Sequence, residues 1–172
     1  MQRILPFSLY FFLVAVFPCL SLAQPGFYDS YEFTGADTLR GMLRPERSCY
    51  DVTFYELDIT VDPAQQSLQG YVDIHYRALT AFRRLQIDLY DNMIIDRIEW
   101  EGALLPFERQ YNAVFINFPD QKAGTAGVFR VYYRGRPAVA DNPPWDGGFV
   151  WKQDDSGMPW VGVACEGDGA SL

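Results

Sequence analysis

Residues 50–78 read YDVTFYELDITVDPAQQSLQGYVDIHYRA, and their pattern indicates the fold class. Apolar and polar residues alternate over residues 50–61, which is the period of a half-buried strand. The apolar parity slips at Tyr55, so we expect a bulge or bend within one long strand. Residues 62–67 are rich in turn formers, and a second alternating run follows over residues 68–78. The stretch therefore predicts an antiparallel hairpin.

Further strand patterns follow this hairpin, and no segment among them holds a helical period for three turns. Turn residues separate several of the runs, as at Glu101-Gly102 and at residues 121–124. These patterns predict an all-β fold, an antiparallel β-sandwich. The additional strands are expected at residues 85–89, 94–100, 114–118 and 128–133.

The N-terminus differs from the rest of the chain. Arg3 is its only charged residue, an apolar run covers residues 9–17, and Ser21-Leu22-Ala23 supplies small residues at the positions that a signal peptidase reads. The run is too short for a membrane span, which needs about 20 apolar residues. We expect residues 1–23 to be a cleaved signal peptide with the cut between Ala23 and Gln24. The mature protein would then be secreted or periplasmic, without a stable membrane anchor.

The mature chain divides into two parts by composition. Residues 24–47 are polar, contain several glycines and show no sustained apolar period, so they are expected to be a lead-in segment. Residues 48–172 carry the strand patterns and are expected to form the domain itself.

Charge and ligand supply exclude two classes of protein. The 172 residues include 22 acidic and 14 basic side chains, for a net charge of −8, which argues against a nucleic-acid-binding protein. A catalytic zinc site needs three protein ligands, and one histidine with three cysteines cannot by themselves supply them. The chain is therefore not expected to be a zinc enzyme on its own. His75 stands alone between Asp73 and Arg77 and is expected to be a partly exposed surface residue. After signal cleavage Cys49 and Cys165 remain, and they are either a disulfide or two free thiols.

An aromatic-rich stretch runs from Gly135 to Trp160 and contains several prolines and glycines. It is expected to be a packed surface loop, because aromatic side chains supply most of its burial. The alternative is a platform for a carbohydrate or a peptide. The acidic pair Asp154-Asp155 in this stretch is expected to be solvated.

The order of several short motifs resembles the opening of the zinc aminopeptidase N family, gluzincins of peptidase family M1. The resemblance covers about residues 44–172. It implies a saddle-like N-terminal β-domain that lines a substrate cleft. The matching motifs are Tyr50-Asp51-Val52, residues 55–63, Leu68-Gln69-Gly70-Tyr71-Val72, residues 85–89, Tyr132-Tyr133-Arg134-Gly135, residues 147–151 and residues 160–167.

The resemblance implies one site residue in this chain. Glu166, after Ala164-Cys165, matches the family position that recognises the substrate N-terminus. A carboxylate suits that task because it binds an α-ammonium through charge-assisted hydrogen bonds.

The family's zinc motif H-E-x-x-H is absent. We therefore expect a fragment of a secreted aminopeptidase, without a cofactor of its own and inactive alone. Zinc would be held by the catalytic domain of a longer polypeptide. The alternative is a free-standing extracellular β-sandwich that binds peptide or glycan through residues 145–160.

Overall fold

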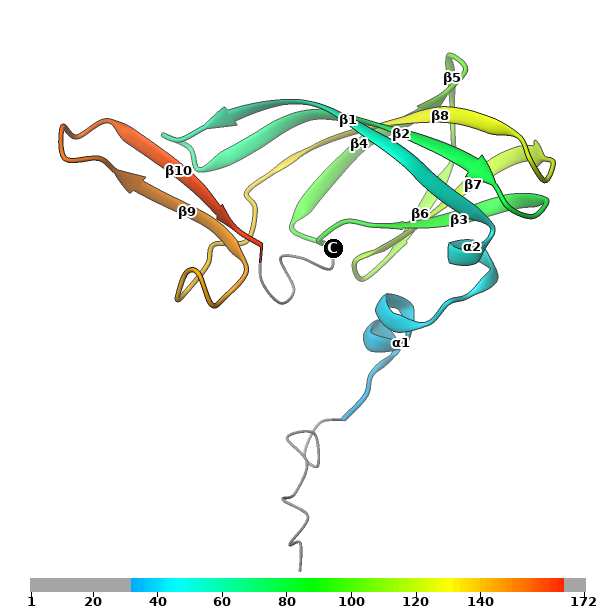
Figure 1. Ribbon diagram of the computed structural model, residues 1–172, viewed down its shortest axis with the longest axis horizontal. Helices are drawn as coiled ribbons and strands as arrows, with labels where there is room; N and C mark the ends of the chain where they lie inside the picture. The colour runs from blue at the N-terminus through cyan, green and yellow to red at the C-terminus, as the bar shows by residue number, and fades with distance from the viewer. Residues whose placement is uncertain (1–31, 166–172) are drawn as a thin grey trace, which may run out of the picture. The chain divides into compact units, whose positions relative to one another are not determined.

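The computed structural model describes residues 32–165 and confirms the predicted all-β fold. Within these residues, ten strands form three antiparallel sheets. The two larger sheets pack face to face, because one cluster of buried side chains draws on strands of both. Figure 1 shows these two layers, with β3, β6 and β7 beneath the larger sheet.

The larger sheet contains the hairpin that the sequence predicts. Its strand order is β1-β2-β8-β4-β5, and all its pairs are antiparallel. The Asp62 carboxylate accepts hydrogen bonds from the backbone N–H groups of Ala64 and Gln65 at 2.9 and 3.0 Å, which stabilises the turn between the first two strands. The five strands are β1 (Tyr50–Asp62), β2 (Ser67–Ala78), β4 (Met93–Trp100), β5 (Ala103–Leu104) and β8 (Ala126–Gly135).

The predicted bulge exists, but it lies nearer the start of β1. The register shifts between Val52 and Phe54 and not at Tyr55. Phe54 consequently faces outward, where its ring makes an edge contact with His75 at a centroid distance of 5.4 Å. The alternation misplaces the bulge because it counts Phe54, an aromatic residue, among the apolar positions of the buried face, whereas this side chain is exposed.

The smaller sheet has the strand order β3-β7-β6, so β3 is an edge strand. Leu85 and Ile116 from this sheet are fully buried against Ile98 and Val131 of the larger one. This contact forms the core between the two layers. The strands are β3 (Phe82–Asp88), β6 (Phe107–Gln110) and β7 (Ala113–Gln121).

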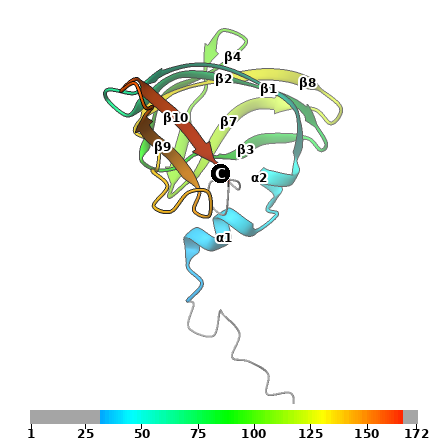
Figure 2. The same ribbon diagram turned by 60° about the vertical axis from the view of Figure 1, so that its left-hand side comes forward.

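The predicted aromatic loop contains a third, two-stranded sheet, so the loop assignment was wrong for much of its length. Strands β9 (Gly148–Gln153) and β10 (Pro159–Ala164) pair antiparallel, as Figures 1 and 2 show. Asp154 is not a merely solvated acid, because it accepts hydrogen bonds from Ser156 and from the N–H of Met158, at 2.7 to 2.9 Å. These bonds organise the hairpin turn and lower the pKa of Asp154.

Two short helices precede β1, in the segment for which no regular structure was expected. Helix α1 (Gly35–Gly41) begins with a capping box between Thr34 and Asp37, and α2 (Pro45–Ser48) is a single turn with proline at its start. Leu39 of α1 is buried against Phe115 of β7. Helix α1 therefore covers part of the outer face of the smaller sheet.

The outer face of the larger sheet carries a partly buried ion pair. Arg130 on β8 donates two hydrogen bonds to the Asp73 carboxylate on β2, both at 2.6 Å. The guanidinium also lies over the ring of Tyr71, 3.7 Å from its centroid. The hydrogen bonds from Arg130 lower the pKa of Asp73.

This ion pair predicts a pH-dependent contribution to stability. Because the pKa of Asp73 is lower in the folded state, its stabilisation is present above the unfolded pKa, about 3.9, and is lost as the pH falls through the folded pKa. We expect Asp73→Asn to lower the free energy of unfolding by about 1 kcal/mol at pH 7. The difference from wild type should shrink towards pH 3 in urea titrations. A difference that stays constant from pH 7 to pH 3 would contradict the assignment.

Candidate functional site

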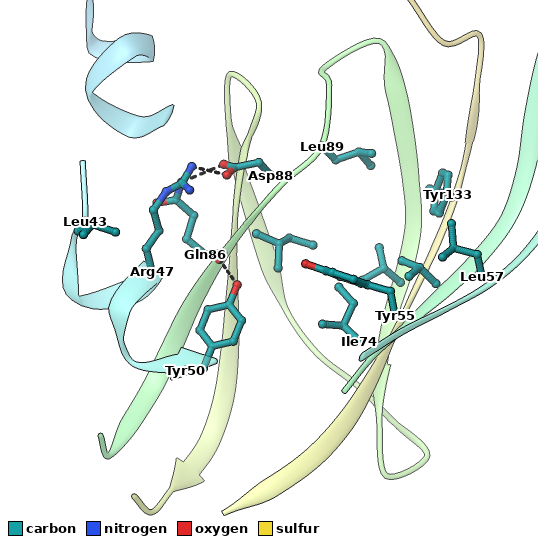
Figure 3. Close-up of a pocket in the computed structure, with 13 residues that line it drawn as sticks. Leu43, Arg47, Tyr50, Tyr55, Leu57, Ile74, Gln86, Asp88, Leu89 and Tyr133 are labelled. Atoms are coloured by element: carbon teal, nitrogen blue, oxygen red, sulfur yellow. Dashed lines mark hydrogen bonds and ion pairs between the residues drawn. The ribbon is translucent and has the colours of Figure 1, made fainter. Parts of the chain in front are cut away.

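The principal cavity, of about 700 Å³, lies between the larger sheet and the edge of β3 (Figure 3). Its sheet wall is apolar, and its other side includes Arg47, Gln86 and Asp88. Tyr55 is 54% exposed although it belongs to this wall, so the face is uncovered in part. The apolar wall is built by Tyr55, Leu57, Val72, Ile74, Val131 and Tyr133.

The polar groups beside the cavity bind one another. Arg47 of α2 forms an ion pair with Asp88 at the end of β3. Gln86 donates from Nε2 to Asp88 Oδ1 at 3.0 Å and to the carbonyl of Leu39 at 2.9 Å. The Tyr50 hydroxyl donates to the Gln86 carbonyl at 2.6 Å, and burial raises the pKa of Tyr50. These contacts fix the helices to β3.

No motif or periodic pattern in the sequence predicts this cavity. Arg47 lay in the expected lead-in segment, and Asp88 had the ordinary place of a polar residue in a strand. Their pairing joins residues 41 positions apart. A search for motifs with fixed spacing does not detect such a contact.

A second hollow, of about 660 Å³, lies between the β1–β2 turn and the hairpin β9–β10. Trp151 and Trp160 line it together with Lys152. Trp160 is 51% exposed, and its ring lies so close to Gly162 that a Cβ there would stand 2.7 Å from it. The Trp151 Nε1–H is buried and has no hydrogen-bond partner among residues 32–165. The hollow is therefore lined by two aromatic side chains and a lysine.

The predicted substrate-binding residue, Glu166, lies outside the described residues. The last described strand, β10, ends at Ala164, which is buried, and Cys165 after it is exposed. The role of Glu166 stays a prediction.

The described residues do not fit a zinc ion. Within residues 32–165 no three side chains from histidine, cysteine, aspartate and glutamate gather in a way that could hold a metal. His75 is half-buried and contacts Phe54, on the outer face of the sheet.

The two cysteines that remain after the expected signal cleavage are free thiols. Cys49 is buried, where its thiol donates to the carbonyls of Glu46 and Arg84 at 3.5 and 3.8 Å. Burial raises the pKa of the Cys49 thiol. Cys165 is exposed.

The small number of possible zinc ligands leads to a prediction for the purified chain. We expect it to bind no stoichiometric zinc and to hydrolyse no aminoacyl substrate, because a catalytic zinc needs three protein ligands and the sequence has one histidine. Metal analysis after dialysis and an aminoacyl-anilide assay check both points. One tightly held zinc per chain would contradict the first, and chelator-sensitive hydrolysis the second.

Comparisons with known proteins identify solved structures of similar fold. No family model matches the sequence, and no curated protein matches it. Among solved structures, a two-domain M1 zinc metallopeptidase bound to L-tryptophan is similar, with a TM-score of 0.56 and 21% identity over 74% of this chain and 29% of that one. An M1 zinc metallopeptidase from Deinococcus radiodurans has a TM-score of 0.51 and 23% identity over 64% of this chain and 27% of its own.

A yeast LTA4 hydrolase is also similar, with a TM-score of 0.55 and 14% identity over 72% of this chain and 20% of the hydrolase. The chain thus spans less than a third of the length of each of these structures. At these identities the likeness concerns the fold, and it agrees with the resemblance that the sequence motifs indicate. The chain has an antiparallel all-β fold similar to that of the N-terminal domain of M1 zinc metallopeptidases.

Proposed function

We propose that the chain is the N-terminal, cleft-lining domain of a secreted zinc metallo-aminopeptidase that removes N-terminal residues from peptides. The observation that carries this proposal is the fold shared with M1 zinc metallopeptidases, together with the order of the sequence motifs. Solved relatives in fold are recorded with bound L-arginine and L-tryptophan, which are free amino acids of the kind that an aminopeptidase releases. The zinc and its ligands would come from a catalytic domain of the same polypeptide.

In this proposal Glu166 binds the free α-ammonium of the peptide. A carboxylate in a closing cleft would both neutralise that charge and position the first peptide bond. Gly167 and Gly169 flank the following acidic residue, and their lack of a side chain lets a substrate backbone approach closely. The support for this role is the sequence motif and the chemistry of the group.

The test is the gene beyond codon 172. We expect its reading frame to encode H-E-x-x-H, and we expect the protein so encoded to release N-terminal residues in a zinc-dependent manner. Removal of zinc by a chelator should abolish the activity, and added zinc should restore it. A reading frame without such a motif would overturn the peptidase proposal.

One observation favours a second candidate function. The hollow at the hairpin β9–β10 is lined by two tryptophans and a lysine, which suits a free-standing extracellular module that binds peptide or glycan. Tryptophan fluorescence titrated with oligosaccharides or peptides tests it. A response in the wild-type chain that Trp160→Ala removes would support this function over the first.

Export is a separate prediction. No helix within residues 32–165 is long and apolar enough to cross a membrane. From the signal-like order of residues 1–23 we expect secreted material to begin at Gln24. N-terminal sequencing of the exported protein checks this, and secreted material that still begins at Met1 would contradict it.

A further inference from the structure

Strand β1 is the outermost strand of the larger sheet (Figure 1). Within residues 32–165 it pairs with β2 alone, and no backbone group of residues 54–61 bonds to any other described segment. In an antiparallel pair, the N–H and C=O groups of every second residue point away from the partner strand. Every second residue of β1 therefore presents a backbone donor and a backbone acceptor along an edge that no described segment covers.

This edge lacks most of the features that keep edge strands from pairing. Short length, bulges, prolines and lysines commonly protect such strands. The bulge of β1 lies before Phe54, and residues 54–62 contain no proline and no lysine. All nine of these residues are exposed. The edge is therefore long enough to accept a strand of ordinary length.

The two rows of side chains along this edge differ in chemistry. Successive side chains of a strand point to opposite faces of the sheet. The residues of the apolar row are 37% to 57% exposed, and the first two of them line the principal cavity. Within the described residues, no member of the acidic row forms an ion pair. The apolar row consists of Tyr55, Leu57, Ile59 and Val61, and the acidic row of Glu56, Asp58 and Asp62.

We propose that the edge of β1 binds an extended segment of another polypeptide in which apolar and basic residues alternate. The backbone of that segment would pair with the free N–H and C=O groups of β1. Its apolar side chains would extend the apolar row, and its basic side chains would lie opposite the acidic row. Opposite charges on directly opposed residues stabilise a strand pair, whereas like charges destabilise it.

Charge argues against a second copy of this chain as the partner. Residues 54–62 include three acidic and no basic side chains, so two β1 strands paired with each other would bring acids together without a compensating cation. A basic segment meets complementary charge there, and the net charge of −8 on the whole chain attracts it. Neither the edge nor its charges depend on the peptidase assignment.

The experiment uses the full chain and a fluorescent peptide of about eight residues in which valine alternates with lysine. Fluorescence anisotropy at about 0.15 M salt limits unspecific attraction between the peptide and the acidic chain. We expect saturable binding. A peptide of the same composition with its valines and lysines in two blocks should bind about tenfold more weakly or worse. A peptide in which glutamate replaces every lysine should show no saturable binding.

Methylation of the peptide backbone tests for strand pairing. Only one edge of the added strand would face β1, so only every second peptide N–H would donate to it. Two versions of the valine–lysine peptide are therefore compared, each N-methylated at alternate residues, one version at the odd and the other at the even positions. We expect one version to lose at least about tenfold in affinity and the other to bind nearly as well as the parent peptide.

Two matched charge reversals locate the binding. Glu56 belongs to the acidic row, whereas Asp155 lies between β9 and β10, and both are exposed. Glu56→Lys and Asp155→Lys change the net charge equally. We expect Glu56→Lys to weaken peptide binding about fivefold or more, because an attraction becomes a repulsion, and Asp155→Lys to weaken it less than about twofold. Circular dichroism should be the same for both variants and the wild-type chain.

Absence of saturable binding to the wild-type chain would overturn the proposal. Equal affinity for the alternating and block peptides, or equal effects of the two charge reversals, would reduce the binding to unspecific attraction between charges. Equal affinity for the two N-methylated peptides would exclude strand pairing. A wild-type dimer in sedimentation experiments that the valine–lysine peptide does not dissociate would assign the edge to a second copy of this chain instead.

Discussion

Replacing Tyr76 with alanine is expected to lower the free energy of unfolding by about 3–5 kcal/mol, the range for removing a large aromatic side chain from a core. Tyr76 is 1% exposed. Its ring meets those of Phe82, Phe118 and Phe129 at centroid distances of 5.8 to 6.0 Å. It also covers Gly127 on β8, where a Cβ would stand 2.8 Å from the hydroxyl. Truncation therefore opens a void at the contact between the two sheets.

The conservative variant separates packing from hydrogen bonding. The Tyr76 hydroxyl donates to Gln121 Oε1 at 3.1 Å, and Gln121 is itself buried. Tyr76→Phe keeps the ring contacts but leaves that oxygen without its donor, which should cost about 1–3 kcal/mol. Urea unfolding measures both variants, with the slope against urea checked for constancy. A loss below about 1 kcal/mol in Tyr76→Ala would show that this ring is not central to the core.

In a longer protein that carries the zinc domain, Glu166→Ala is expected to reduce kcat/KM about ten- to hundredfold. Charge-assisted hydrogen bonds contribute about 1.5–3 kcal/mol, which corresponds to that range. The proposed contact with the α-ammonium operates in the ground state and in the transition state, so substrate binding and turnover should both suffer. Glu166→Gln should be milder, because the amide oxygen still accepts a hydrogen bond.

The control is Asp168→Ala, a second acid two residues along the chain. Its removal should change kcat/KM little, because no binding role is proposed for it. Steady-state kinetics on an aminoacyl substrate and on a short peptide measure all three variants. Equal and small effects of Glu166→Ala and Asp168→Ala would show that Glu166 is an ordinary solvated acid.

The sequence misplaced or missed features whose evidence is not local. Strands β9 and β10 lie in a stretch rich in proline and glycine, which reads as a loop, yet they pair with each other, and Phe149 exchanges hydrogen bonds with Ala138 and Ala140. Helices α1 and α2, of seven and four residues, are too short to establish a helical period. Only the capping pair Thr34 and Asp37 marked the first of them.

The amino-acid sequence alone predicts the all-β class, the hairpin of β1 and β2, and most of the strands that build the two packed sheets. These features follow from alternation over neighbouring residues and from turn formers between them, which are local properties of the chain. The resemblance to the M1 peptidase fold also rests on such short motifs in order.

The position of the bulge and the principal cavity follow from the assembled sheets and from no single segment of the sequence. The cavity joins Leu43 before α2, Tyr55 on β1 and Tyr133 on β8, which are far apart in sequence and share no spacing rule. Their meeting depends on how the smaller sheet covers one part of the larger sheet's face and leaves another part uncovered. Burial of one sheet against another is a property of the assembled layers, and no periodic pattern within a single strand records how far that coverage extends.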